Sequence, residues 1–103
     1  MGGCVQVADD WGWGDMGANW PATKETPHID ALANSGLRFT DFHAMSLCTP
    51  SRAALLTGRF GLRTGVVTNF SPYSKYGLPL NESTLAERLR PAGCALYLCL
   101  PSR

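Results

Sequence analysis

Two short segments of the chain carry residues whose types and spacing could support chemistry. In the first, Asp9 and Asp10 are adjacent carboxylates between a short apolar segment and the glycine-rich stretch WGWGDMG. Ca²⁺ and Mg²⁺ prefer oxygen ligands, and ligands of open α/β sheets gather beyond the carboxyl ends of strands. Consecutive strand residues point to opposite faces, so both carboxylates could bind one ion only where the strand breaks, which Gly12 and Gly14 would allow. A solvated acidic turn is the alternative interpretation.

The second segment contains Cys48, which immediately precedes a predicted helix. Unpaired backbone N–H groups and the helix dipole favour an anion at such a position. Arg52 follows four residues later and can reach back along the same helix face. A reactive group at position 48 beside a guanidinium would form a sulfate or phosphate site. An inert cysteine at a helix start is the alternative.

Three helices are predicted to position these segments. Each combines a preferred N-cap residue with a glycine at its end, and the first two add proline at the first helical position. The third has capping-box spacing between its N-cap and a glutamate three residues later. The N-cap and terminal glycine pairs are Thr26 and Gly36 (with Pro27), Thr49 and Gly58 (with Pro50), and Thr84 and Gly93 (with Glu87).

Three apolar or alternating segments, residues 4–8, 37–43 and 94–100, are predicted to be strands, and residues 60–80 a loop. Strands separated by helices predict an α/β fold with a mainly parallel sheet flanked by helices. Parallel sheets are normally buried on both faces. Three strands and three helices are too few to cover both faces, which indicates an incomplete α/β layer.

The composition narrows the class of protein. With 103 residues and 45% hydrophobic content, the chain is one small domain or part of a larger one. A net charge of +1 without a basic cluster argues against nucleic acid or a membrane as partner. No signal peptide is predicted, because the start is neither basic nor apolar. The cysteines lack zinc-ligand spacing, and Cys4, Cys94 and Cys99 are predicted to be buried or free thiols.

Five blocks in this chain resemble, in the same order, the motifs of the sulfatases. The sequence from Cys48 resembles the family's C-x-P-S-R…T-G-R signature, and the acidic segment resembles its metal motif D-D-x-G-x-G-D. The resemblance is strongest to the arylsulfatase A and G group. The blocks are residues 9–15 (DDWGWGD), 26–30 (TPHID), 36–42 (GLRFTDF), 48–59 (CTPSRAALLTGR) and 77–87 (GLPLNESTLAE).

The resemblance implies the N-terminal part of an alkaline-phosphatase-like catalytic domain over residues 1–93, followed by a divergent or truncated tail over 94–103. It implies that a formylglycine-generating enzyme, which reads the motif in the unfolded chain, oxidises Cys48 to Cα-formylglycine. One hydroxyl of the hydrated aldehyde would attack the sulfur of a sulfate ester and expel the alcohol. Deprotonation of the second hydroxyl would then regenerate the aldehyde and release sulfate.

The resemblance also implies a role for each site residue. Arg52 would stabilise the nucleophile, while Asp9, Asp10 and the modified Cys48 would bind one divalent cation, usually Ca²⁺. Such an ion neutralises sulfate oxygens and lowers the pKa of a bound hydroxyl. The family further implies a lysosomal or secretory location, and Asn81 begins a glycosylation sequon, Asn-Glu-Ser.

The sequence also departs from the family pattern. Its lysines and histidines (Lys24, Lys75, His28 and His43) match none of the family's later catalytic positions, and the later Asp/Asn metal ligands are missing. We therefore expect the isolated chain to be inactive, and a noncatalytic fragment modified by the formylglycine-generating enzyme is the main alternative to an enzyme. An alkaline-phosphatase-like phosphoesterase is disfavoured, because those enzymes place Ser or Thr where this chain has Cys48.

Overall fold

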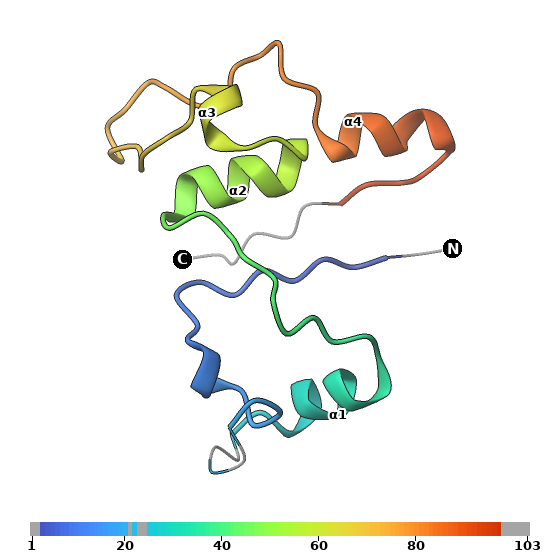
Figure 1. Ribbon diagram of the computed structural model, residues 1–103. Coiled ribbons are helices and arrows are strands. Elements are labelled where there is room, and N and C mark those ends of the chain that lie inside the picture. The colour runs from blue at the N-terminus through green and yellow to red at the C-terminus, as the bar shows by residue number, and fades with distance from the viewer. Residues whose placement is uncertain (1–2, 21, 23–24, 98–103) are drawn as a thin grey trace. The chain divides into compact units, whose positions relative to one another are not determined.

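The computed structural model describes all residues except 1–2, 21, 23–24 and 98–103. The chain divides into two compact units, Met1–His43 and Ala44–Arg103. Helices are the regular elements of both units (Figure 1). In chain order these are η1 (Trp13–Asp15), α1 (Pro27–Ser35), α2 (Cys48–Thr57), α3 (Gly61–Thr64), α4 (Leu85–Leu89) and η2 (Arg90–Ala92).

The first unit contains the short 3₁₀ turn η1 and the helix α1. As predicted, Thr26 is the N-cap residue of α1 and Pro27 its first residue. Gly36 ends the helix, and its N–H donates to the carbonyl oxygen of Leu32 at 3.0 Å. The predicted boundaries of this helix are therefore confirmed.

The Thr26 side chain has a different role from the predicted cap. Its Oγ1 accepts from the Gly17 N–H at 3.0 Å and donates to Asp30 Oδ1 at 3.0 Å. The same Asp30 oxygen accepts from the Ala18 N–H at 2.9 Å, and Arg38 donates to the Ala18 carbonyl at 2.7 Å. We call Thr26 and Asp30 the α1 latch, because they hold the loop after η1 against the first turn of α1.

The second unit is built around α2, which contacts both α3 and α4. Its small core is formed by residues of α2, of α3 and of the turn that follows α3. Figure 1 shows α3 beside α2 in this unit. Among the residues of this unit that the structure describes, those that are buried are Pro50, Ala53, Gly61, Thr64 and Val66.

The start of α2 differs from the prediction. The helix begins at Cys48 with Leu47 as N-cap, so Thr49 is not the cap and Pro50 is the third helical residue. The shift follows from the Ser51 N–H, which donates to the Leu47 carbonyl at 3.1 Å and so closes a turn beginning at Cys48. Pro50 is tolerated because the first-turn N–H groups have no partner within the helix. The predicted end at Gly58 is confirmed, with a left-handed backbone at φ 68°.

Of the two remaining α-helices, α4 begins as predicted, whereas α3 was not predicted. The predicted capping box of α4 is confirmed: Glu87 N donates to Thr84 Oγ1 at 3.3 Å, and Thr84 N donates to Glu87 Oε2 at 2.8 Å. The one-turn helix α3 lies inside the predicted loop 60–80 and was not expected. Four residues are too few to display a helical period in the sequence.

The three predicted strands are wrong for the residues that the structure describes. Residues 4–8, 37–43 and 94–97 form no strand, and residues 98–100 lie outside the described part of the chain. A strand requires hydrogen bonds to a neighbouring strand, and a buried one also requires packing over its faces. Large apolar side chains here are instead exposed, among them Val5 at 70% and Leu37 at 84%.

No helix in the described part of the chain has the length and apolar character needed to cross a membrane.

Candidate metal ligands and nucleophile

The two adjacent carboxylates lie where the N-terminal segment bends. Asp9 and Asp10 are both exposed, and Asp10 has a left-handed backbone with φ 54°, which aspartate tolerates better than most residues. The chain therefore bends at the expected place, although no strand precedes the bend and its cause differs from the prediction. Neither Gly12 nor Gly14 has a positive φ, so Asp10 itself makes the turn.

The pair has the chemistry of a hard-cation site. One carboxylate oxygen of Asp9 and one of Asp10 lie within 4.8 Å of each other. Two oxygens that each bind Ca²⁺ at about 2.3–2.6 Å can be at most about 5.2 Å apart. The spacing of the two carboxylates therefore fits a single calcium ion without rearrangement of the backbone.

The third acid of the DDWGWGD segment has a different local role. The Asp15 carboxylate accepts from the Gly12 N–H at 2.7 Å, and the Asp15 N–H donates to the Gly12 carbonyl at 3.1 Å. These two bonds close the turn η1 immediately after the adjacent carboxylates. A side chain at position 12 would crowd this turn, since a Cβ there would lie 3.2 Å from Asp15 Oδ2.

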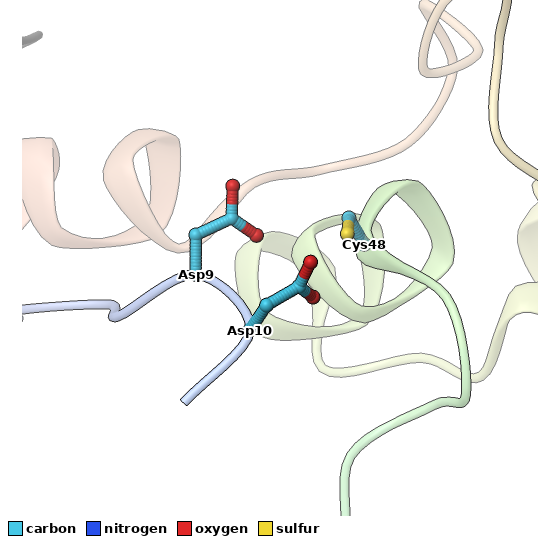
Figure 2. Close-up of side chains that lie close together, drawn as sticks. All are labelled: Asp9, Asp10 and Cys48. Carbon is cyan, nitrogen blue, oxygen red and sulfur yellow. The ribbon is translucent and has the colours of Figure 1, made fainter. Parts of the chain in front are cut away.

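The sulfur-bearing residue lies at the start of α2 in the second unit. Cys48 is the first residue of α2 (Figure 2). Its side chain is half-buried. Arg52 is exposed one turn later on the same helix, at the four-residue spacing that places two side chains on one face. The prediction placed Cys48 just before this helix, whereas the helix includes Cys48 as its first residue, so α2 carries both residues.

The backbone around Cys48 is less open to an anion than predicted. Of the first three residues of α2, Pro50 has no N–H, and Thr49 donates its N–H to Asn69 Oδ1 at 2.9 Å. Ser51 donates through its hydroxyl to the Met45 carbonyl at 2.7 Å, which holds the segment leading into the helix. The charge of an anion near Cys48 would therefore be met chiefly by side chains such as Arg52.

Asn69 is the residue that sequence reasoning missed. It stands 20 positions after Thr49, and its only sequence signal was the weak sequon Asn69-Phe70-Ser71 before a proline. No local pattern predicts a partner so far along the chain.

Other residues with reactive side chains lie in exposed positions. His28 is exposed on α1, and His43 is exposed beside Asp41. Cys4 and Cys94 are free and exposed, which agrees with the prediction of buried or free thiols, while Lys24 and Cys99 fall outside the described residues.

Comparison with known proteins decides which family these motifs represent. The profile of the Sulfatase family matches residues 5–99. The chain belongs to the sulfatase family. Membership of this family implies an alkaline-phosphatase-like α/β fold, although the described residues of this chain form no strand.

Named sulfatases match most of the chain. Arylsulfatase G of Homo sapiens is 62% identical over 90 residues, which is 86% of this chain and 17% of that protein. Arylsulfatase A of Bos taurus is 54% identical over 88 residues, covering 84% of this chain and 17% of the relative. N-acetylgalactosamine-6-sulfatase of Mus musculus is 44% identical over 96 residues, covering 84% of this chain and 18% of the relative.

The chain thus spans about a sixth of the length of the sulfatases it resembles, 17% for arylsulfatase G. No solved structure matches it.

Proposed function

We propose that this protein contributes the nucleophile and two metal ligands to a sulfatase that hydrolyses aryl or sugar sulfate esters. The observation that carries the proposal is the segment Cys48-Thr49-Pro50-Ser51-Arg52, which forms the first turn of α2 in a chain of the sulfatase family. The substrate class follows from the names of the relatives, which include arylsulfatases and an N-acetylgalactosamine-6-sulfatase.

Cys48 is proposed as the precursor of Cα-formylglycine. Before the chain folds, a formylglycine-generating enzyme would oxidise the Cβ carbon of Cys48 to an aldehyde and release its sulfur as hydrogen sulfide. Dioxygen would be the oxidant, with two further electrons from a thiol reductant, so that its second oxygen atom leaves as water. When hydrated, this aldehyde supplies a hydroxyl nucleophile for the sulfur and a second hydroxyl whose deprotonation releases sulfate. The half-buried position of Cys48 at the start of a helix restricts the motion of that side chain.

Arg52 is proposed to stabilise the negative charge near Cys48. Its guanidinium is permanently charged and can make paired hydrogen bonds to sulfate oxygens. The exposure of Arg52 leaves it accessible to a substrate from solvent.

Asp9 and Asp10 are proposed to bind one Ca²⁺ together with the modified Cys48. The spacing of the two carboxylates suits this ion, and the part of Cys48 follows from the family motif alone. A bound calcium ion would neutralise the sulfate oxygens and lower the pKa of the attacking hydroxyl.

We further propose that residues 1–93 form the start of the catalytic domain and that residues 94–103 are a divergent tail. In the whole enzyme, a mainly parallel sheet flanked by helices would cover apolar side chains such as Leu37, exposed here at 84%. A lysosomal or secretory location and glycosylation at Asn81 complete the proposal.

A noncatalytic fragment is the second candidate. It is favoured by the length of the match, since the chain corresponds to 17% of arylsulfatase G. Such a fragment would be modified at Cys48 but would not hydrolyse a sulfate ester by itself.

Mass spectrometry after co-expression with a formylglycine-generating enzyme tests both candidates. We expect an aldehyde at position 48, none in Cys48→Ala, and an unchanged yield in the matched control Cys94→Ala. Release of sulfate from an aryl sulfate by the modified chain would establish the enzyme, whereas modification without release would establish the fragment. A thiol retained at Cys48, while a peptide carrying C-x-P-x-R is converted in the same cells, would contradict the proposed nucleophile.

A further inference from the structure

Asn69 forms a long-range hydrogen bond to the first turn of the helix that carries Cys48. Its side-chain Oδ1 accepts from the Thr49 N–H at 2.9 Å, across 20 positions of sequence. Both residues belong to the unit Ala44–Arg103. The bond therefore ties the segment after α3 to the residue next to Cys48.

The first turn of α2 needs such a partner because its own sequence provides a poor cap. Leu47 is the N-cap residue and has no side-chain acceptor, whereas Asn, Asp, Ser and Thr are preferred there. A helix leaves its first N–H groups without internal partners, and Pro50 removes one of them altogether. The Asn69 oxygen takes the place that an N-cap side chain would normally occupy.

The buried core brings Asn69 to this position. Gly61 and Val66 lie in the segment between α2 and Asn69, and both are buried. A Cβ on Gly61 would lie 3.3 Å from the Pro50 Cβ, so this segment packs directly on the first turn of α2. Asn69 follows Val66 by three residues, and its side chain accepts from Thr49 in the same turn.

We propose that Asn69 is a positioning residue that fixes the backbone at Thr49 and thereby the orientation of the side chain at position 48. The inference rests on the proposed role of Cys48 for its functional meaning. The hydrogen bond itself is independent of that role. Loss of the bond would release the first turn, so that Cys48 leaves its helical backbone conformation while the rest of α2 persists.

Nuclear magnetic resonance of the full 103-residue chain, with Cys48 unmodified, tests the inference. Asn69→Ala removes the acceptor, and Asn69→Asp keeps an acceptor oxygen at the same place. Ser71→Ala abolishes the sequon Asn69-Phe70-Ser71 but leaves the Asn69 oxygen, and so is the matched control. The readouts are hydrogen exchange at the Thr49 amide and the Cα and Cβ chemical shifts of Cys48.

We expect Asn69→Ala to accelerate exchange at Thr49 by about fivefold, as for a lost helix cap, and to move the Cys48 shifts toward random-coil values. Asn69→Asp and Ser71→Ala should retain the parent values. The Glu87 amide, which donates to Thr84 in α4, reports on general loosening and should be unchanged in all three variants.

Two results would overturn the inference. One is an unchanged Thr49 exchange rate and unchanged Cys48 shifts in Asn69→Ala. The other is loss of the Thr49 protection in Asn69→Asp while the Glu87 amide keeps its parent exchange rate. This second criterion needs only the aspartate variant, so it applies even if Asn69→Ala unfolds. Because none of these readouts needs formylglycine or turnover, failure of the proposed sulfatase activity would leave them unaffected.

Discussion

Arg59 Nη1 donates to both carboxylate oxygens of Glu82 at 2.7 Å, and the Glu82 side chain is only 6% exposed. Arg59 directly follows the glycine that ends α2, and Glu82 precedes the capping box of α4. The pair therefore joins the end of α2 to the start of α4. A cavity of about 450 Å³ lies beside it, lined in part by Leu55, Leu56 and Arg88.

The two halves of this ion pair should respond differently to removal. Arg59→Ala leaves a nearly buried carboxylate unpaired, which costs about 1–3 kcal/mol of unfolding free energy. Glu82→Ala leaves a guanidinium that is 48% exposed and can be hydrated, so its cost should be smaller. Urea unfolding followed by circular dichroism measures both. Equal losses, or a larger loss in Glu82→Ala, would contradict the proposed burial of the carboxylate.

The carboxylate pair predicts a weak calcium site in the isolated chain. With only two charged ligands, both exposed, we expect a Kd on the order of 1 mM. Asp9→Asn and Asp10→Asn should each raise this Kd by about tenfold, because each removes one of the two ligand charges. Titration followed by the fluorescence of the neighbouring Trp11 reports binding. Asp41→Asn, an exposed acid of the same unit, is the control, and an equal effect of this variant would indicate nonspecific attraction.

Gly61 predicts a packing defect when any side chain is added. Its ideal Cβ would lie 2.2 Å from the Val66 carbonyl oxygen, so Gly61→Ala must displace the backbone at the start of α3 or at Val66 in the turn after it. We expect a loss of about 1–3 kcal/mol of unfolding free energy, typical of overpacking. Gly77→Ala is the matched control, because no heavy atom lies within 4 Å of its Cβ position and its φ is not positive. A Gly61→Ala protein as stable as this control would contradict the described contact.

The α1 latch predicts selective opening of the loop after η1. Asp30→Ala removes the acceptor of Ala18 N–H, and Thr26→Val removes the acceptor of Gly17 N–H. Each variant should accelerate hydrogen exchange at its own amide by about fivefold, the equivalent of about 1 kcal/mol. Thr26→Ser keeps the hydroxyl and should preserve protection, as should Asn34→Ala on the exposed part of α1. Unchanged exchange in both latch variants would show that the loop is held by other contacts.

Local signals in the sequence predicted the helix ends well. The glycines at positions 36 and 58 end α1 and α2 as expected, and Thr84 with Glu87 forms the expected capping box. Each of these features depends on residues within about four positions of one another. The start of α2 was misplaced because Thr49 and Pro50 are both favoured near helix starts, and the competing cap at Leu47 uses only its backbone.

Features that depend on distant residues could not be predicted. The bond from Thr49 to Asn69 spans 20 positions, and the bond from Arg59 to Glu82 spans 23. The strand predictions failed for the same reason: alternation at Leu37 and Phe39 indicates which side chains favour burial, but a strand forms only when a neighbour supplies hydrogen bonds. For the site, the sequence predicted that Arg52 lies one turn from Cys48, although it placed Cys48 just before the helix rather than in it. The left-handed Asp10 had no sequence signal other than the tolerance of aspartate for that conformation.

The uncovered apolar side chains along residues 37–42 carry a practical consequence for anyone handling the purified polypeptide. Phe39 and Phe42 stack as a tilted pair with ring centroids 6.2 Å apart, yet they remain 67% and 77% exposed. Exposed apolar side chains on two copies of the chain can pack against each other, so the chain should self-associate as its concentration rises. Low protein concentration and mild detergent should keep the chain monomeric. Chaperones that bind exposed hydrophobic segments should bind residues 37–42 during synthesis.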